Sequence, residues 1–191
     1  MRLLITSFGP FANFKVNPSD SVMLLLQGHL KAESLHYSIE YEKLEVSYSA
    51  VDLFLKKIEK FHYDFIIHLG VATNDAMIRL ETRARNERSG EDEFGVVPIK
   101  SEIFENSLDI QTNFPRDMIE DFTKNHPRSV RISEDAGTFL CNYIYYNSLH
   151  LYRNQSNVLF IHIADYLNNK DAVNAADQAK IICSFIQAYL V

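Results

Sequence analysis

The sequence predicts an α/β protein, a single-domain three-layer α/β/α sandwich with a mostly parallel open sheet over residues 1–191. Short apolar runs that stop at glycine or polar residues alternate with longer stretches whose apolar residues recur at helical spacing. No linker, internal repeat or low-complexity tract interrupts the alternation. Strands that are joined through helices run parallel, and the connecting helices cover both faces of the sheet.

The first part of the chain gives two strands and two helices. Residues 2–7 are an apolar run that stops in a loop containing glycine and proline, which is typical of a buried strand. A helix over 19–29 follows, with polar residues at its start that suit an N-cap. Alternation over 38–46 predicts a strand, and helical spacing over 51–61 predicts an amphipathic helix.

The middle of the chain gives two strands and a long loop. Residues 64–70 are a short apolar run that ends in glycine, which predicts another buried strand. Residues 76–83 alternate apolar and polar side chains at period two, which predicts a strand with one polar face. The polar, glycine-containing segment 86–98 is expected to be a loop that covers a site.

The last part of the chain returns to the alternating pattern. Short strands are expected over 108–111 and 130–132, on either side of a helix over 116–125. A buried strand over 156–163 and a long amphipathic helix over 171–190 complete the chain.

Cys141 is expected in the first turns of a helix that follows the polar cluster 133–135, which has the composition of an N-cap region. The partial positive charge of a helix N-terminus favours a thiolate, so Cys141 is a candidate nucleophile if a histidine lies nearby. The alternative is a small, buried packing residue. Cys183, among the apolar positions of the last helix, is expected to pack.

Two further groups complete a set that could carry out acyl transfer. His162 lies near the carboxyl end of a buried strand, where the catalytic side chains of α/β enzymes gather. Glu81 lies on the polar face of its strand among arginines, and a surface ion pair is the competing interpretation. A thiol nucleophile needs a base, and the base needs an acid that orients it. His68 is expected to be structural, with a backbone partner.

Composition argues against several function classes. The net charge of −6 and the pI near 5.6 argue against a nucleic-acid partner, because phosphate contacts need clustered Lys and Arg. Two cysteines make no disulfide framework and no metal-ligand spacing appears, so a zinc site is not expected. The apolar runs are too short for a signal peptide or a membrane span, so we expect no membrane partner and a reduced cytoplasmic location.

The segment Ser-x-Asp-Ala-Gly-Thr-Phe-Leu-Cys-Asn-Tyr-x-Tyr-Tyr-x-Ser-Leu-His, which contains Cys141, resembles the nucleophile segment of the pyrrolidone-carboxylate peptidases. These are the cysteine peptidases also called pyroglutamyl peptidase I. Further stretches resemble the same family in the same order, so the resemblance covers essentially the whole chain. They are residues 8–11 with 17–19, residues 67–70 with 80–81 and Asn86, and residues 160–163.

The resemblance implies a cysteine exopeptidase that hydrolyses the N-terminal pyroglutamyl residue from peptides through an acyl-enzyme, without a cofactor. It implies Cys141 as the nucleophile, His162 as the general base and acid, and Glu81 as the residue that orients His162. It also implies Phe8 and Phe11 as pocket walls around the pyroglutamyl ring. From their loop position alone, these two rings could equally plug the top of the core.

The chain departs from the family pattern at several positions, which bear on pocket shape more than on the three reactive groups. A low-activity or inactive member that binds pyroglutamyl groups or peptide N-termini is therefore an alternative, as is a different acyl transfer on the same sheet. Whether the chain forms a homo-oligomer stays open. The departures are Ser7, Gly9, Ala12 and Asn13 in the N-terminal loop and residues 71–75 after Gly70, with Arg85 and Arg88 as candidates for the arginine that the family carries after the glutamate.

Overall fold

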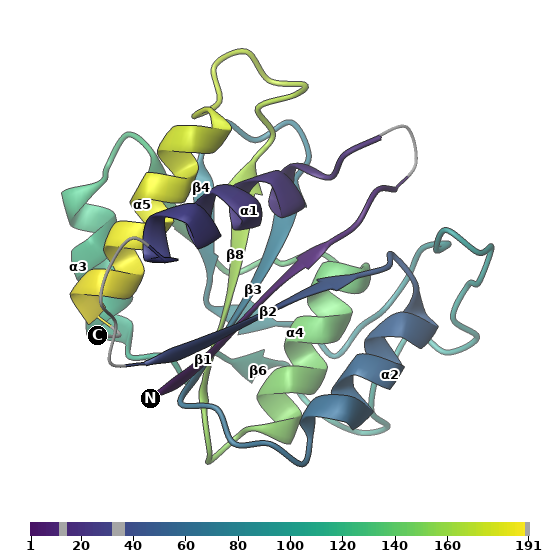
Figure 1. Cartoon of the computed structure of the whole chain (residues 1–191). Helices are drawn as coiled ribbons and strands as arrows, with labels where there is room; N and C mark the ends of the chain where they lie inside the picture. The colour runs from purple at the N-terminus through teal and green to yellow at the C-terminus, as the bar shows by residue number, and fades with distance from the viewer. Residues whose placement is uncertain (12–14, 32–36, 190–191) are drawn as a thin grey trace.

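A six-stranded sheet, in the order β2-β1-β3-β8-β4-β7, forms the centre of the computed structural model (Figure 1). The structure describes residues 1–11, 15–31 and 37–189. β4 runs antiparallel to β8, and the other neighbouring strands run parallel, so the predicted mostly parallel sheet is confirmed. The strands are β1 (Arg2–Phe8), β2 (Ser38–Leu44), β3 (Phe65–Ala72), β4 (Ile78–Glu81), β7 (Val130–Ser133) and β8 (Asn157–Ala164).

Helices cover both faces of this sheet, which confirms the three-layer arrangement (Figure 1). One face packs against α1 (Pro18–Lys31), α3 (Arg116–Asn125) and α5 (Ala175–Tyr189). The other face packs against α2 (Tyr48–Ile58) and α4 (Leu140–Leu151). A short antiparallel pair, β5 (Arg83–Ala84) with β6 (Ile110–Gln111), lies beside the main sheet. Across the described ranges, no helix combines the length and apolarity that a membrane crossing needs.

Alternation along β8 decides which side chains meet α4. Leu159 and Ile161 belong to the core on the α1, α3 and α5 side, whereas Phe160 belongs to the core beneath α2 and α4. Successive strand residues point to opposite faces, so His162 shares the α4 side with Phe160. Both faces of the central strands are covered. A polar side chain on either face is therefore buried and needs a partner.

The boundaries around Cys141 differ from the expectation. The cluster 133–135 does not cap the helix, because Ser133 ends β7 and the Asp135 N–H bonds to the Ser133 Oγ at 3.2 Å in a turn. α4 instead begins at Leu140 after an N-cap at Phe139, which forms no side-chain cap hydrogen bond. The N-cap prediction was therefore wrong, although Cys141 does lie in the first turn of a helix.

Other boundaries shift by a few residues. The strand expected over 76–83 is shorter, because the chain leaves the sheet after Glu81. The last helix begins at Ala175 and not at 171, and Leu190, its expected end, lies outside the described residues. Residues 86–98 form a loop, as the sequence predicts.

Candidate active site

α4 carries Cys141 to the surface of β3. Cys141 is a free, partly buried thiol in the first turn of the helix, the end at which anionic groups are stabilised. A Cβ atom built on Gly70 would lie 2.8 Å from the Cys141 Sγ and 2.7 Å from the Phe160 Cζ. Gly70 is therefore the position that lets the sulfur lie directly against the strand.

Glu81 and His162 meet between β4 and β8. The His162 Nδ1 lies 2.8 Å from the Glu81 Oε1, and the two residues are 5 % and 0 % exposed. In the antiparallel register Arg79 pairs with His162 and Glu81 pairs with Phe160, which makes Glu81 and His162 diagonal neighbours on one face. The interpretation of Glu81 as a surface ion pair was wrong, because Glu81 is fully buried and its charged partner is His162.

The surroundings of His162 favour its protonated form. Burial by itself lowers the pKa of His162, because it disfavours the charged ring. Hydrogen bonds to the side chains of Cys141 and Glu81 outweigh this effect and raise the pKa of His162 to about 9. Since Nδ1 faces Glu81, Nε2 is the nitrogen left for Cys141. The structure thus brings together the three reactive groups that the sequence singled out.

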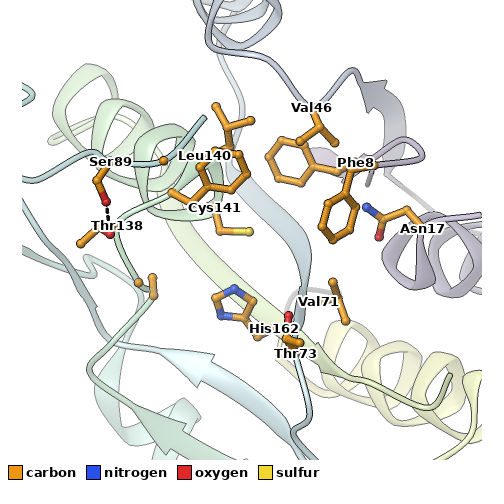
Figure 2. Close-up of a pocket in the computed structure, with 15 residues that line it drawn as sticks. Phe8, Asn17, Val46, Val71, Thr73, Ser89, Thr138, Leu140, Cys141 and His162 are labelled. Carbon is orange, nitrogen blue, oxygen red and sulfur yellow. Dashed lines mark hydrogen bonds between the residues drawn. The ribbon is translucent and has the colours of Figure 1, made fainter. Parts of the chain in front are cut away.

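A pocket of about 360 Å³ opens beside the Cys141 sulfur. Figure 2 shows Cys141 and His162 on one side of this pocket and Phe8 and Asn17 on the other. The Asn17 side chain is held in place, since its Nδ2 donates to the Gly9 carbonyl at 2.9 Å. The described residues that line the pocket are Phe8, Phe11, Asn17, Val46, Val71, Thr73, Ser89, Gly90, Ala136, Gly137, Thr138, Phe139, Leu140, Cys141 and His162.

The loop 86–98 reaches this pocket. Ser89 and Gly90 line it, and the Ser89 N–H donates to the Thr138 carbonyl at 2.7 Å. Asn142, fully buried next to the nucleophile, donates its amide to the carbonyls of Arg85 and Glu87. The residue after Cys141 therefore anchors the start of the loop, whose position the sequence does not give.

The two candidate arginines, Arg85 and Arg88, lie outside the pocket. Arg85 pairs with Asp135 at 3.2 Å, and the guanidinium of Arg88 lies over a tyrosine ring on α4. Ala12 and Asn13 lie outside the described residues. In the described part of the chain, no group of three or more His, Cys, Asp and Glu side chains could hold a metal ion.

Some residues of the site carried no specific sequence prediction. Gly70 was visible only as the glycine that ends an apolar run, and its contact with the sulfur depends on where α4 docks. Asn17 and Asn142 both lie within the motifs that carry the family resemblance, yet their roles as backbone anchors appear only in the fold. His68 was expected to have a backbone partner, and it has two side-chain partners instead.

A thiol, an imidazole and a carboxylate in contact, beside an apolar pocket at a helix N-terminus, are the groups that thiol-dependent hydrolases use. The family model described as pyroglutamyl peptidase matches residues 1–182. The pyrrolidone-carboxylate peptidase of Alkaliphilus oremlandii is 32% identical over 171 residues, covering 85% of this chain and 78% of that protein. The chain therefore belongs to the pyroglutamyl peptidase family and is an enzyme of the cysteine peptidase class.

Solved structures agree with this membership. The pyrrolidone carboxyl peptidase of Fervidobacterium islandicum AW-1 superposes with a TM-score of 0.84 at 27% identity, covering 100% of this chain and 98% of that one. Pyroglutamyl peptidase I of Bacillus amyloliquefaciens gives a TM-score of 0.76 at 26% identity, covering 96% and 95%. The fold is thus shared along the whole chain.

Proposed function

We propose that this protein is a cysteine exopeptidase that removes the N-terminal pyroglutamyl residue from peptides, with residues 1–191 acting as one catalytic unit. The observation that carries the proposal is the contact of His162 with both Cys141 and Glu81. In the proposed triad Cys141 is the nucleophile, His162 is the general acid and base, and Glu81 orients the imidazole.

The proposed reaction starts from a Cys141 thiolate beside a His162 imidazolium. The Cys141 thiolate attacks the carbonyl carbon that links the pyroglutamyl ring to the next residue, and a C–S bond forms. As the C–N bond breaks, the His162 imidazolium gives its proton to the leaving amine. The now neutral His162 takes a proton from water, whose oxygen displaces the sulfur from the thioester. The products are free pyroglutamate and the shortened peptide, and no cofactor takes part.

The start of α4 supplies donors for the tetrahedral oxyanion. The first N–H groups of a helix have no acceptor within the helix, and the N-cap residue Phe139 gives them no side-chain acceptor. The backbone N–H of Cys141 is one of these groups, and it lies beside the carbon that the sulfur attacks. A preorganised donor of this kind stabilises the transition state by about 3 kcal/mol.

The pocket suits a neutral lactam. Pyroglutamate has no free α-amine, so its site needs apolar walls and a few polar groups but no buried countercharge. Phe8 and Phe11 provide aromatic walls, and Asn17 and Thr73 provide polar atoms. None of the described residues that line the pocket is Asp or Glu. An N-terminal proline, which carries a charged amine on a ring of the same size, would therefore bind poorly.

A reducing compartment such as the cytoplasm fits this proposal, because the reaction needs a free thiol. Neither Cys141 nor Cys183 forms a disulfide. Cys183 lies on α5, on the opposite face of the sheet, so it belongs to the packed core and not to the pocket.

The test is hydrolysis of a pyroglutamyl-amide reporter, with the matching prolyl-amide reporter as the substrate control. We expect turnover of the pyroglutamyl reporter alone. Cys141→Ser should reduce kcat by at least about 10³-fold, because the hydroxyl is a far weaker nucleophile here. Cys183→Ser is the matched control and should retain the wild-type rate.

Other outcomes would point elsewhere. Undiminished turnover by Cys141→Ser would exclude the thiol mechanism. Saturable pyroglutamate binding without turnover, even at high enzyme concentration, would favour the alternative of an inactive, binding member of the family, which the departures at Ala12 and Asn13 motivate. Cleavage of a different amide or ester, with the pyroglutamyl reporter inert, would indicate another acyl transfer at the same groups.

A further inference from the structure

The carboxylate of Glu81 has little to hold it apart from the residue it orients. Its Oε1 is bonded to His162, and its Oε2 is buried with no hydrogen-bond partner among the described residues. The position of the carboxylate must therefore come from the backbone of Glu81. That backbone lies at the end of β4, where the strand leaves the sheet. A strand end is the part of a ladder with the fewest hydrogen bonds to hold it.

Tyr145 adds a hydrogen bond at this strand end, where Glu81 also pairs with Ser133 of β7 and Phe160 of β8. The Tyr145 hydroxyl donates to the Glu81 carbonyl at 2.7 Å, and the tyrosine ring is fully buried. Glu81 and Phe160 are register partners in the antiparallel β4–β8 pair. Tyr145 thus contacts both strands next to His162, through its hydroxyl at Glu81 and through its ring, which lies against the Phe160 ring.

The nucleophile and this link come from one helix. Cys141 and Tyr145 are four positions apart on α4, so both point to the same face of the helix. The Tyr145 ring lies 5.8 Å from the Phe160 ring, which in turn lies 4.6 Å from the His162 ring. α4 therefore brings the sulfur to the imidazole and, one turn later, fixes the strands that carry the imidazole and the carboxylate.

We infer that Tyr145 is a positioning residue of the triad, whose hydroxyl holds the Glu81 backbone so that the carboxylate stays in contact with His162. Its value for turnover rests on the proposed function, whereas its effect on His162 can be measured without any substrate. Nothing in the inference requires Tyr145 to touch the peptide, and it does not line the pocket.

The other charged groups near His162 leave Glu81 and Cys141 as the ones that set its protonation. Arg79 lies opposite His162 in the register of β4 and β8, but its guanidinium is ion-paired with Asp75. The same carboxylate pairs with Arg131 on β7. Asp75 therefore holds both guanidinium groups and offsets one of their two positive charges. These three groups stay constant in the variants described next.

Tyr145→Phe removes only the oxygen, and Tyr152→Phe is a matched control. Tyr152 caps the other end of α4, is also buried, and donates to the Ile58 carbonyl at 2.6 Å. Tyr145→Phe loses the hydrogen bond to the Glu81 carbonyl, and Tyr152→Phe loses those to the Ile58 and Phe61 carbonyls, so a purely structural role predicts at least as large an effect in the control. We expect only Tyr145→Phe to lower kcat, by about 10-fold with KM unchanged, which is the size of effect that outer-shell partners have.

The decisive readout is the titration of the His162 ring by NMR, in wild type and in both variants. We expect Tyr145→Phe to lower the pKa of His162 by about half a unit or more, because a displaced carboxylate stabilises the imidazolium less. Tyr152→Phe should titrate like wild type. Sucrose, which favours folded states, is present throughout so that all three proteins are compared folded.

Identical His162 titration in the two variants, with equal kcat, would overturn the inference. Should the wild-type protein fail to turn over the pyroglutamyl reporter, the proposed function would be wrong, yet the titration would still decide whether Tyr145 sets the Glu81–His162 contact. The two failures are therefore distinguishable.

Discussion

Two buried histidines lie on the same face of the sheet, beneath the same helix, and behave in opposite ways. His68 on β3 is 0 % exposed and His162 on β8 is 5 % exposed. Burial lowers the pKa of His68 to about 3. His162 suffers the same effect of burial, yet its pKa is raised to about 9. Burial alone therefore does not decide the charge of a histidine in this protein.

The hydrogen-bond partners of each histidine decide its charge. His68 hydrogen-bonds two neutral hydroxyls, the Thr6 Oγ1 at 2.8 Å and the Ser148 Oγ at 2.9 Å. Neutral partners satisfy the ring but do not compensate a positive charge, so His68 stays neutral and joins β1, β3 and α4. His162 instead meets an acid and a thiol. At one end of the interface between α4 and the sheet, neutral His68 joins the elements through hydrogen bonds. At the other end, charged His162 contacts the reactive thiol.

The largest expected effect comes from giving His162 a neutral partner like those of His68. In Glu81→Gln the side chain keeps its shape but loses its charge, so the pKa of His162 should fall below about 9, with Cys141 left as the partner that raises it against the effect of burial. Turnover of the pyroglutamyl reporter should fall by about 10³-fold or more, as in other triads that lose the orienting carboxylate. Ring titration by NMR and kcat/KM measure the two effects.

Glu120→Gln is the control for that change. Glu120 pairs with Arg116 at 2.8 Å on the surface of α3, so its loss should leave both the rate and the His162 titration unaltered. A Glu81→Gln protein whose His162 still titrated near 9 would break the comparison, because partner charge would then not explain the difference between the two histidines.

A smaller loss of activity is expected from a substitution at Gly70. This residue lies two positions after His68, on the same face of β3. His68 fills the space under α4, whereas Gly70 leaves it empty for the Cys141 sulfur. Gly70→Ala puts a Cβ 2.8 Å from that sulfur, so one of the two must move. A displacement of the nucleophile of this size lowers kcat by about 10- to 100-fold.

Gly28→Ala is the matched control, since a Cβ at this position in α1 meets no atom within 4 Å. The control should keep its activity and gain up to about 1 kcal/mol of stability from the better helix former. Equal activity of the two alanine variants, measured with the same reporter, would mean that the sulfur does not need the space above β3.

The sequence carried the order of the elements and the identity of the reactive residues, but not their burial. Period-two alternation placed Glu81 on a polar face, and the pattern is real. What it cannot tell is that a second helical layer covers this face, because that depends on where α4 docks. The antiparallel direction of β4, which makes Glu81 and His162 diagonal neighbours, follows from the short connection between β3 and β4, and β8 enters between these two strands only near the end of the chain.

The N-cap prediction was wrong because the same short polar cluster is typical of two local structures. Residues 133–135 have the composition of an N-cap, but turns with side-chain hydrogen bonds use the same residue types. The partners of His68 and the bond from Tyr145 to Glu81 were also beyond reach, since each joins residues that are far apart in sequence. Residue types and motifs identified the reactive groups. The hydrogen bonds that hold those groups in place are seen only in the fold.

The smallest expected effect is the change in unfolding free energy per unit of pH. This slope has opposite signs for His68 and His162. An unfolded histidine binds a proton below pH 6.5, but folded His68 does not until about pH 3, so the unfolding free energy falls as the pH drops from 6.5. Folded His162 keeps its proton up to about pH 9, so its contribution is fully present below pH 6.5 and is lost as the pH rises from 6.5 to 9. Each slope is limited to about 1.4 kcal/mol per pH unit.

Urea unfolding of wild type and His68→Gln between pH 4 and 6.5 isolates the acid side, because the glutamine can bond both hydroxyls but does not titrate there. The pKa of Asp75, lowered to about 2 by its hydrogen bonds and arginine partners against the opposing effect of burial, affects stability only below about pH 4, outside this window. We expect the wild-type unfolding free energy to fall more steeply with decreasing pH than that of His68→Gln. Parallel curves would mean that His68 takes up its proton in the folded protein almost as readily as in the unfolded chain, and the contrast with His162 would then lie in reactivity alone.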